Sequence, residues 1–211
     1  GLRQIADYVE NFLVCAVDVG IAAQTAALAA ESLGLGICYL GSIRNNVQAV
    51  IDLLRTAAST AEREGLTLAL ENEHVCWADT GRNTAKIIER VGLTSLKVNW
   101  DPANSFLAGE TPYPDGYHCL KGCIAHVHFK DAKVYREKLN EVGIMAAPLE
   151  FHSPKLPGLG DIEWNKFISA LNDIRYSGCA CIEVEDKNFE GSLDDRKHAL
   201  VLSKRYLSNF L

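Results

Sequence analysis

Four side chains that can bind a divalent cation lie at or near the ends of strand-like stretches. They are Glu71, Asp101, His128 and Glu183, in the runs LTLALE (66–71), LKVNWD (96–101), IAHVHFKD (124–131) and CACIEVE (179–185). Each alone has a structural alternative, as a solvated carboxylate or a satisfied histidine. Together they predict a cation site, because clustered carboxylates repel one another unless a cation compensates. Three carboxylates and one imidazole suit Mn²⁺, Mg²⁺ or Co²⁺.

The spacing of these residues fits repeated βα units. Gaps of 30 and 27 positions separate the first three residues, and a gap of 55 separates the last two. Helical periodicity with capping residues occupies 46–64, 80–92 and 161–178, with Thr80 and Asp161 as starts and Gly65, Gly92 and Gly178 as stops. Residues 132–160 carry three prolines without periodicity and are interpreted as a long loop. Because parallel strands end on one face, we expect the four candidate ligands to converge there.

The predicted fold class is α/β: a partial or rearranged TIM-barrel-like (β/α) array of about five or six parallel strands with flanking helices. A fifth clear strand candidate is GICYLG (36–41), and FLVCAV (12–17) is a weaker one. A complete barrel has eight strands and typically ~250 residues. The 211-residue chain is therefore expected to leave sheet edges uncovered, which favours a homo-oligomer.

Composition restricts the class of partner. The net charge of -6 opposes binding to nucleic acid or to an anionic membrane, so a small molecule is the expected partner. The apolar stretch FLVCAVDVGIAAQTAALAA is interrupted by Asp18 and Gln24, which favours a buried helix over a membrane span. Seven cysteines lack disulfide-scaffold or paired zinc spacing, and they are interpreted as buried structural thiols in a cytoplasmic protein.

From about residue 56 to 211 the chain resembles the C-terminal half of the xylose isomerase-like TIM-barrel family of sugar (phosphate) isomerases and epimerases. The matching stretches are LALENEH, LKVNWDPANSFLAGE, HVHFKDA, PGLGDIEW and YSGCACIEVED. The resemblance implies a divalent metal held by Glu71, Asp101, His128 and Glu183. It also implies that Glu71 and Glu183 exchange protons with a substrate carbon while the metal polarises sugar oxygens.

Further residues near the four candidates are predicted to assist them. Lys130 is a candidate contact for a sugar hydroxyl or a phosphate, with a solvated lysine as the alternative. His126 shares the strand face of His128, so it is a candidate substrate or supporting contact, with plain packing as the alternative. Asn104 is a candidate to orient Asp101 or to touch substrate. Glu73 and Glu185 each follow a candidate ligand by two positions, as supporting partners or as solvent-facing charges.

The first quarter of the chain resembles a different family. Residues 10–54 are similar to a stretch of the flavin-dependent NADPH nitroreductases, which predicts an αβα segment over 1–55 within a single α/β domain, 1–211. In that family the loop matching GSIRN lies near FMN, which implies contacts from Gly41, Ser42 and Arg44. The residues that grip the flavin elsewhere in that family are not recognisable here, so no cofactor-binding residues are assigned.

The sequence therefore leaves three functions to be distinguished. The first is a metal-dependent sugar or sugar phosphate isomerase or epimerase, which the incomplete barrel could leave inactive. The second is an engineered or recombined chimeric scaffold without catalytic activity. An FMN-binding protein is the third and least supported. A DNA-repair endonuclease of related fold would need further metal ligands and a basic groove, and the sequence shows neither.

Overall fold

A computed structural model describes residues 46–143 and 151–210 of the chain. They lie within one compact unit, Ile43–Leu211. The helices are α2 (Val47–Arg63), α3 (Gly81–Val91), α4 (Pro102–Leu107), α5 (Tyr117–Leu120), α6 (Arg136–Val142), α7 (Trp164–Asp173) and α8 (Leu193–Leu207). The strands are β1 (Leu68–Glu71), β2 (Leu96–Trp100), β3 (Ile124–Phe129), β4 (Asp131–Val134), β5 (His152–Lys155) and β6 (Ala180–Ile182). Short helical segments lie at Pro112–Gly116 and Lys187–Phe189.

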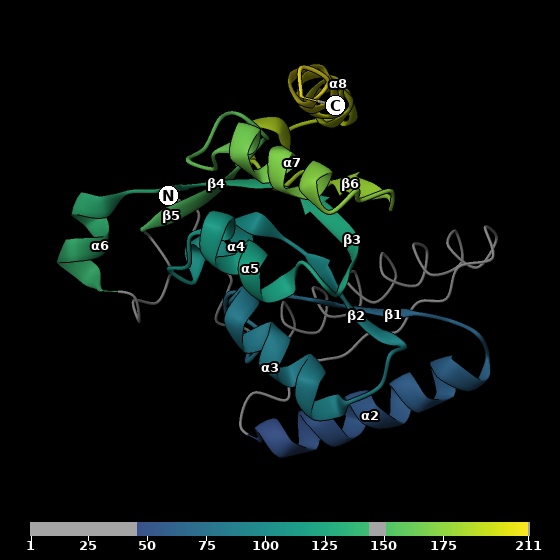
Figure 1. The fold of residues 1–211 in the computed structure, drawn as a ribbon. Helices are drawn as coiled ribbons and strands as arrows, with labels where there is room; N and C mark the ends of the chain where they lie inside the picture. The colour runs from purple at the N-terminus through teal and green to yellow at the C-terminus, as the bar shows by residue number, and fades with distance from the viewer. Residues whose placement is uncertain (1–45, 144–150, 211) are drawn as a thin grey trace, which may run out of the picture. The chain divides into compact units, whose positions relative to one another are not determined.

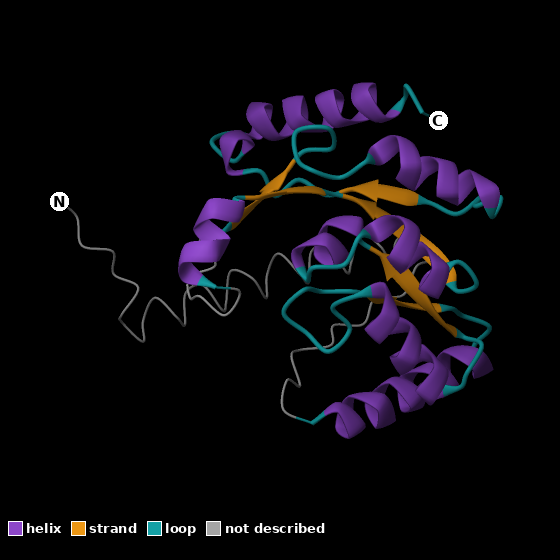
Figure 2. Ribbon diagram, turned by 60° about the vertical axis from the view of Figure 1, so that its left-hand side comes forward, coloured by secondary structure: helices purple, strands orange, loops and turns teal. Residues whose placement is uncertain are grey.

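Four strands form one parallel sheet in the order β1-β2-β3-β6. The sheet is curved and twisted (Figure 2), with α2 and α3 near β1 and β2, and α7 and α8 near β6 (Figure 1). The predicted α/β array of parallel strands with flanking helices is confirmed. Within the described ranges, β1 and β6 form the two edges of the sheet and do not pair with each other, so this sheet is open. The candidate strand 36–41 lies outside these ranges.

Side chains along β2 and β3 point alternately to the two faces of the sheet, and only one of these faces packs into the main core. Val98 and Trp100 on β2, and Val127 and Phe129 on β3, belong to the main buried cluster. They pack against α7, where the ring of Phe167 lies 4.6 Å from that of Trp100. The intervening residues point to the opposite face of the sheet, because successive side chains on a strand alternate. That opposite face carries the polar residues Asn99, His126 and His128.

Side-chain caps begin α2 and α3, and both predicted ends of α3 are confirmed. The Asn46 side chain accepts a hydrogen bond from the Ala49 N–H at the start of α2. Thr80 caps α3 through the N–H of Asn83, and Gly92 ends that helix with a positive φ. A side-chain oxygen at the first position satisfies an N–H that the helix leaves open. These two helices pack on each other and on β1 and β2, so their caps help to fix the first half of the sheet.

The interpretation of 132–160 as a long loop is wrong. Strands β4 and β5 form an antiparallel hairpin, with Asp131 opposite Lys155 and Val134 opposite His152, and α6 lies between them in sequence. Each strand has only four residues, and Pro154 interrupts the second, so the period-2 pattern is too short to recognise. The predicted strand 124–131 is accordingly two strands, β3 and β4.

Asp131 anchors the segment that follows the hairpin. One carboxylate oxygen accepts hydrogen bonds from the Ala132 and Ile162 N–H groups, and the other from the Gly158 N–H and the Trp164 indole. A carboxylate with this many donors can remain buried without an ion pair. It thereby fixes the start of α7 from a position about thirty residues earlier in the chain.

Three further expectations are corrected. Asp161 does not start α7; it accepts a hydrogen bond from the Val134 N–H, and the helix begins at Trp164. The helix stops at Asp173, well before Gly178, and Arg175 adopts a positive φ. The cysteines predicted to be buried are not: Cys119 and Cys123 are half-buried, and Cys179 and Cys181 are exposed on or beside β6, an edge strand of the sheet that the described residues form. No helix within 46–143 or 151–210 is long and apolar enough to cross a membrane.

Candidate metal centre

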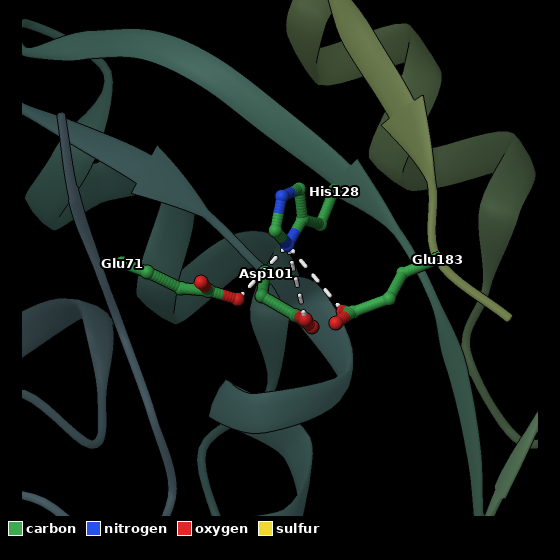
Figure 3. Close-up of side chains that lie close together, drawn as sticks. All are labelled: Glu71, Asp101, His128 and Glu183. Atoms are coloured by element: carbon green, nitrogen blue, oxygen red, sulfur yellow. Dashed lines mark hydrogen bonds and ion pairs between the residues drawn. The ribbon is translucent and has the colours of Figure 1, made fainter. Parts of the chain in front are cut away.

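The four predicted ligands converge at the carboxyl ends of the parallel strands. Glu71 ends β1, Asp101 follows β2, His128 lies near the end of β3, and Glu183 follows β6. One ligand atom of each lies within 4.8 Å of the others. His128 Nδ1 is 2.9 Å from Glu71 Oε1, 3.4 Å from Glu183 Oε2 and 3.9 Å from Asp101 Oδ2. Figure 3 shows the four side chains pointing toward one another.

The arrangement of buried oxygens fits a bound cation. Asp101 Oδ2 and Glu183 Oε2 are shielded from solvent, and both face the Lys130 ammonium and His128 Nδ1. Clustered, buried carboxylate oxygens are costly unless cations compensate their charge. The donor set of three carboxylates and one imidazole suits a hard or borderline divalent ion. The residues present therefore fit a divalent metal.

Lys130 supplies positive charge to the same oxygens. Its ammonium lies 3.0 Å from both Asp101 Oδ2 and Glu183 Oε2, and 3.2 Å from Glu185 Oε2. All three contacts are ion pairs. Lys130 is almost fully buried, so the solvated lysine allowed on sequence is wrong. Glu185 is thus a partner of Lys130 rather than an isolated surface charge.

Protonation in the cluster follows from burial and from these contacts. Burial opposes a charged His128, but hydrogen bonds to Glu183 and Glu71 outweigh it and raise the pKa of His128 to about 10. Burial would raise the pKa of Glu183, but His128 and Lys130 lower it to about 2. Burial raises the pKa of Asp101 to about 7, although Lys130 opposes this shift. Without a metal, protonated His128 and Lys130 are the cations that balance the carboxylates.

Asn72 fixes the backbone that carries Asp101. Its side-chain oxygen accepts from the Asp101 N–H at 2.8 Å, and its amide donates to the Asp101 carbonyl at 2.8 Å. Asn72 is fully buried and follows Glu71 directly, so it links the ends of β1 and β2. Asp101 also caps α4, because its Oδ1 accepts from the Asn104 N–H. That cap leaves Oδ2 facing the cluster.

Replacing Asn72 with alanine is expected to lower the free energy of unfolding by about 2–3 kcal/mol, because two buried backbone groups lose their partners. Loss of this support is also expected to weaken Mn²⁺ binding by about 10–100-fold. Urea unfolding and calorimetric titration measure the two effects. Asn172→Ala, at an exposed position on α7, is the matched control. Unchanged Mn²⁺ affinity in Asn72→Ala would show that Asn72 does not position Asp101.

Two other predicted residues lie beside the cluster. The Asn104 side chain donates to the Asn72 carbonyl and lines a pocket next to Lys130. The His126 ring contacts that of His128 edge-on at 5.6 Å. Their contact with substrate stays a prediction. Gly41, Ser42 and Arg44 lie outside the described residues.

Three residues of the site were not predicted from sequence. His74 forms an ion pair with Glu73 at 2.6 Å, and its ring meets the ring of His152 edge-on at 5.4 Å. Asn99 contacts His128 Nε2 at 3.0 Å, on the side of the ring away from the carboxylates. Asn99 could have been predicted, because residues two positions apart on a strand share a face and Asn99 lies two residues before Asp101. The sequence around His152 carries no comparable signal.

The family is decided by a match over almost the whole chain. The family model described as "Xylose isomerase-like TIM barrel" matches residues 7–207. The protein belongs to this family. The match runs through the predicted junction near residue 55, so the segment boundaries 1–55 and 56–211 stay a prediction.

Several solved structures have a similar fold. The IOLI protein with a bound zinc atom is 18% identical with a TM-score of 0.61, over 82% of this chain and 62% of that one. The probable 3-DHS dehydratase AsbF from Bacillus anthracis is 20% identical with a TM-score of 0.58, over 75% and 55%. D-Psicose 3-epimerase from Clostridium cellulolyticum H10 is 18% identical with a TM-score of 0.52, over 81% and 60%. At these identities the likeness shows the fold.

Short matches to flavin enzymes confirm part of the mixed resemblance. FMN reductase (NADPH) of Bacillus subtilis (strain 168) is 44% identical over 55 residues, which are 26% of this chain and 22% of that protein. NADPH-flavin oxidoreductase of Vibrio harveyi is 46% identical over 63 residues, 30% of this chain and 26% of that protein. The chain thus spans under a third of the length of these curated relatives.

Proposed function

We propose that the protein is a divalent-metal-dependent isomerase or epimerase that acts on a sugar or sugar phosphate by proton transfer next to a carbonyl. The observation that supports this most is the convergence of Glu71, Asp101, His128 and Glu183 within 4.8 Å at the strand ends. Epimerases among the structures of similar fold support the same reaction class. Mn²⁺, Mg²⁺ and Co²⁺ all suit the donor set.

We propose that Glu71 and Glu183 move the proton. They reach the cluster from opposite sides (Figure 3), so one can remove a proton from the carbon next to the carbonyl while the other returns one. In the metal-free protein His128 and Lys130 lower the pKa of Glu183 against the effect of burial, so this residue is a carboxylate there. A divalent metal held by the four residues would supply Lewis-acid polarisation of neighbouring sugar oxygens.

A scaffold without activity is the second candidate, and the open sheet favours it. Strands β1 and β6 form unpaired edges in the part of the chain that the structure describes. An uncovered edge also supports assembly of several copies, so a homo-oligomer is part of this proposal. Sedimentation at several protein concentrations measures the number of copies.

Deuterium incorporation separates the two candidates. The Mn²⁺-loaded protein is incubated with a ketose in D₂O, and NMR follows exchange at the carbons next to the carbonyl. Exchange that requires Mn²⁺ and Glu183 supports the enzyme. Absence of exchange over a panel of ketoses and ketose phosphates supports the scaffold.

A further inference from the structure

The Lys130 ammonium contacts the same carboxylate oxygens that face the middle of the four-ligand cluster. It lies 3.0 Å from Asp101 Oδ2 and 3.0 Å from Glu183 Oε2. These two oxygens are also the ones that face His128 Nδ1, at 3.9 Å and 3.4 Å. A divalent ion held by the cluster would therefore share two of its ligand oxygens with an ammonium group.

The other oxygen of Asp101 is already used by the protein. Oδ1 caps α4 by accepting from the Asn104 N–H at 3.0 Å, and Asn72 holds the Asp101 backbone through its N–H and its carbonyl. Asp101 is fully buried, so water does not screen the charges around Oδ2. Two cations at one buried oxygen repel each other, because the effective dielectric constant is low there. The ammonium and a metal ion are therefore competitors for Oδ2.

A carboxylate outside the four-ligand cluster offers the ammonium another position. Glu185 Oε2 is already 3.2 Å from the ammonium, and the Glu185 side chain is 47% exposed. Glu185 and Glu73 both line a pocket of about 220 Å³ that Lys130 also borders. A lysine ammonium is a compact charge on a flexible four-carbon stem, so it can move within such a pocket. It can thus leave the metal ligands and keep a carboxylate partner.

Resting on the proposed function, which includes the metal centre, we propose that Lys130 is an internal competitor for the metal and that Glu185 receives its ammonium when the metal binds. Lys130 then sets the metal affinity, because its charge must leave Asp101 Oδ2 and Glu183 Oε2 before a second cation is favourable there. Both Lys130 and Glu185 act on the metal through its ligands, so they are positioning residues.

The test is a calorimetric titration of the metal-stripped, full-length protein with Mn²⁺. Lys130→Met removes the charge and keeps a long side chain, and Glu185→Gln removes the carboxylate that receives the ammonium. The double variant completes the cycle. Lys133→Met and Glu190→Gln, at exposed positions on and near the same segments, are the matched controls. Thermal unfolding with and without Mn²⁺ checks the fold of each variant.

We expect Lys130→Met to bind Mn²⁺ about tenfold more tightly than wild type, an effect of the size usual for residues that contact metal ligands. Glu185→Gln is expected to bind Mn²⁺ about 3–10-fold more weakly, and this loss should largely disappear in the Lys130→Met background. A general effect of the lost negative charge would instead be equal in both backgrounds. Equal or weaker binding in Lys130→Met, or an equal effect of Glu185→Gln in both backgrounds, would overturn the proposal.

A second readout follows the ammonium in the wild-type protein. Pulsed acetylation with and without Mn²⁺, read by mass spectrometry, measures the reactivity of each lysine. Lys130 is expected to react several-fold faster with Mn²⁺ bound, because Glu185 is half-exposed whereas Asp101 is buried. Lys155, which pairs with Asp186 at 3.1 Å, is the internal control and should not change. Unchanged or slower acetylation of Lys130 would overturn the movement, even if Lys130→Met failed to fold.

The outcomes separate this inference from the proposed function. Tighter Mn²⁺ binding in Lys130→Met, with no deuterium incorporation into a ketose by wild type, would support the competition and contradict the enzyme. Mn²⁺-dependent deuterium incorporation by wild type, with unchanged or weaker Mn²⁺ binding in Lys130→Met, would leave the enzyme standing and overturn the competition. Absence of Mn²⁺ binding in both proteins would overturn both proposals.

Discussion

Replacing Glu183 with glutamine is expected to lower kcat by about 10²–10⁴ at saturating Mn²⁺, the usual contribution of a general acid or base. Glutamine keeps the size of the side chain and one oxygen, but it cannot accept a proton. In the metal-free protein His128 and Lys130 lower the pKa of Glu183 against the effect of burial, so Glu183 is a carboxylate there. Deuterium incorporation into a ketose, measured over a range of Mn²⁺ concentrations, separates lost catalysis from lost metal.

Glu163→Gln is the matched control for this prediction. Glu163 is exposed at the start of α7 and pairs with Lys166 one turn away, so its replacement leaves the site intact. The control is expected to keep full activity. If Glu183→Gln retained more than a tenth of wild-type turnover at saturating Mn²⁺, Glu183 would not be the group that moves the proton.

Metal affinity is expected to rise about tenfold for each pH unit between pH 7 and pH 8.5, because the metal must displace a proton from His128. Burial opposes a charged His128, but the hydrogen bonds to Glu183 and Glu71 raise its pKa to about 10. At neutral pH the metal-free imidazole is therefore protonated. Calorimetry in buffers of different ionisation enthalpy should count about one proton released for each Mn²⁺ bound.

The thermal stability of the metal-free protein is expected to fall as the pH rises, whereas the metal affinity rises. The pKa of His128 is raised from 6.5. Its contribution to the free energy of unfolding is therefore complete below pH 6.5 and is lost as the pH rises through about 10. Asp101, with its pKa raised by burial from 3.8 to about 7, also loses its contribution as the pH rises. Glu183 contributes above pH 4.5 and loses its contribution as the pH falls through about 2. Metal-free Tm should thus fall above neutral pH.

His128→Gln is the decisive variant for the pH prediction. Without the imidazole, both the proton release and the pH slope of Mn²⁺ affinity above pH 7 should largely disappear, and the affinity itself should fall. A wild-type affinity that does not change between pH 7 and pH 8.5 would contradict the link between the metal and the His128 proton.

The convergence of the four candidate ligands could be predicted from sequence because it depends on a simple rule. Each ligand follows an apolar run, and the carboxyl ends of parallel strands share one face. The rule needs only approximate strand ends: Glu183 lies just beyond β6 and Asp101 just beyond β2, yet both reach the cluster. Local capping rules were sufficient for α3, where Thr80 and Gly92 mark the two ends.

The hairpin and its histidine could not be predicted in the same way. Strands β4 and β5 have four residues each, and their pairing joins Asp131 to Lys155 across a long sequence separation. The start of α7 likewise depends on Asp131, through hydrogen bonds to Ile162 and Trp164. These contacts depend on tertiary structure, so neither composition nor periodicity predicts them.

The central claim is that Glu71, Asp101, His128 and Glu183 form one divalent metal site. Calorimetric titration of metal-stripped protein with Mn²⁺ at pH 7.5, for wild type and Glu183→Gln, tests it most directly. We predict one site of micromolar affinity in wild type, weakened at least tenfold by the substitution. An absence of Mn²⁺ binding in wild type, or equal binding in both proteins, would contradict the claim.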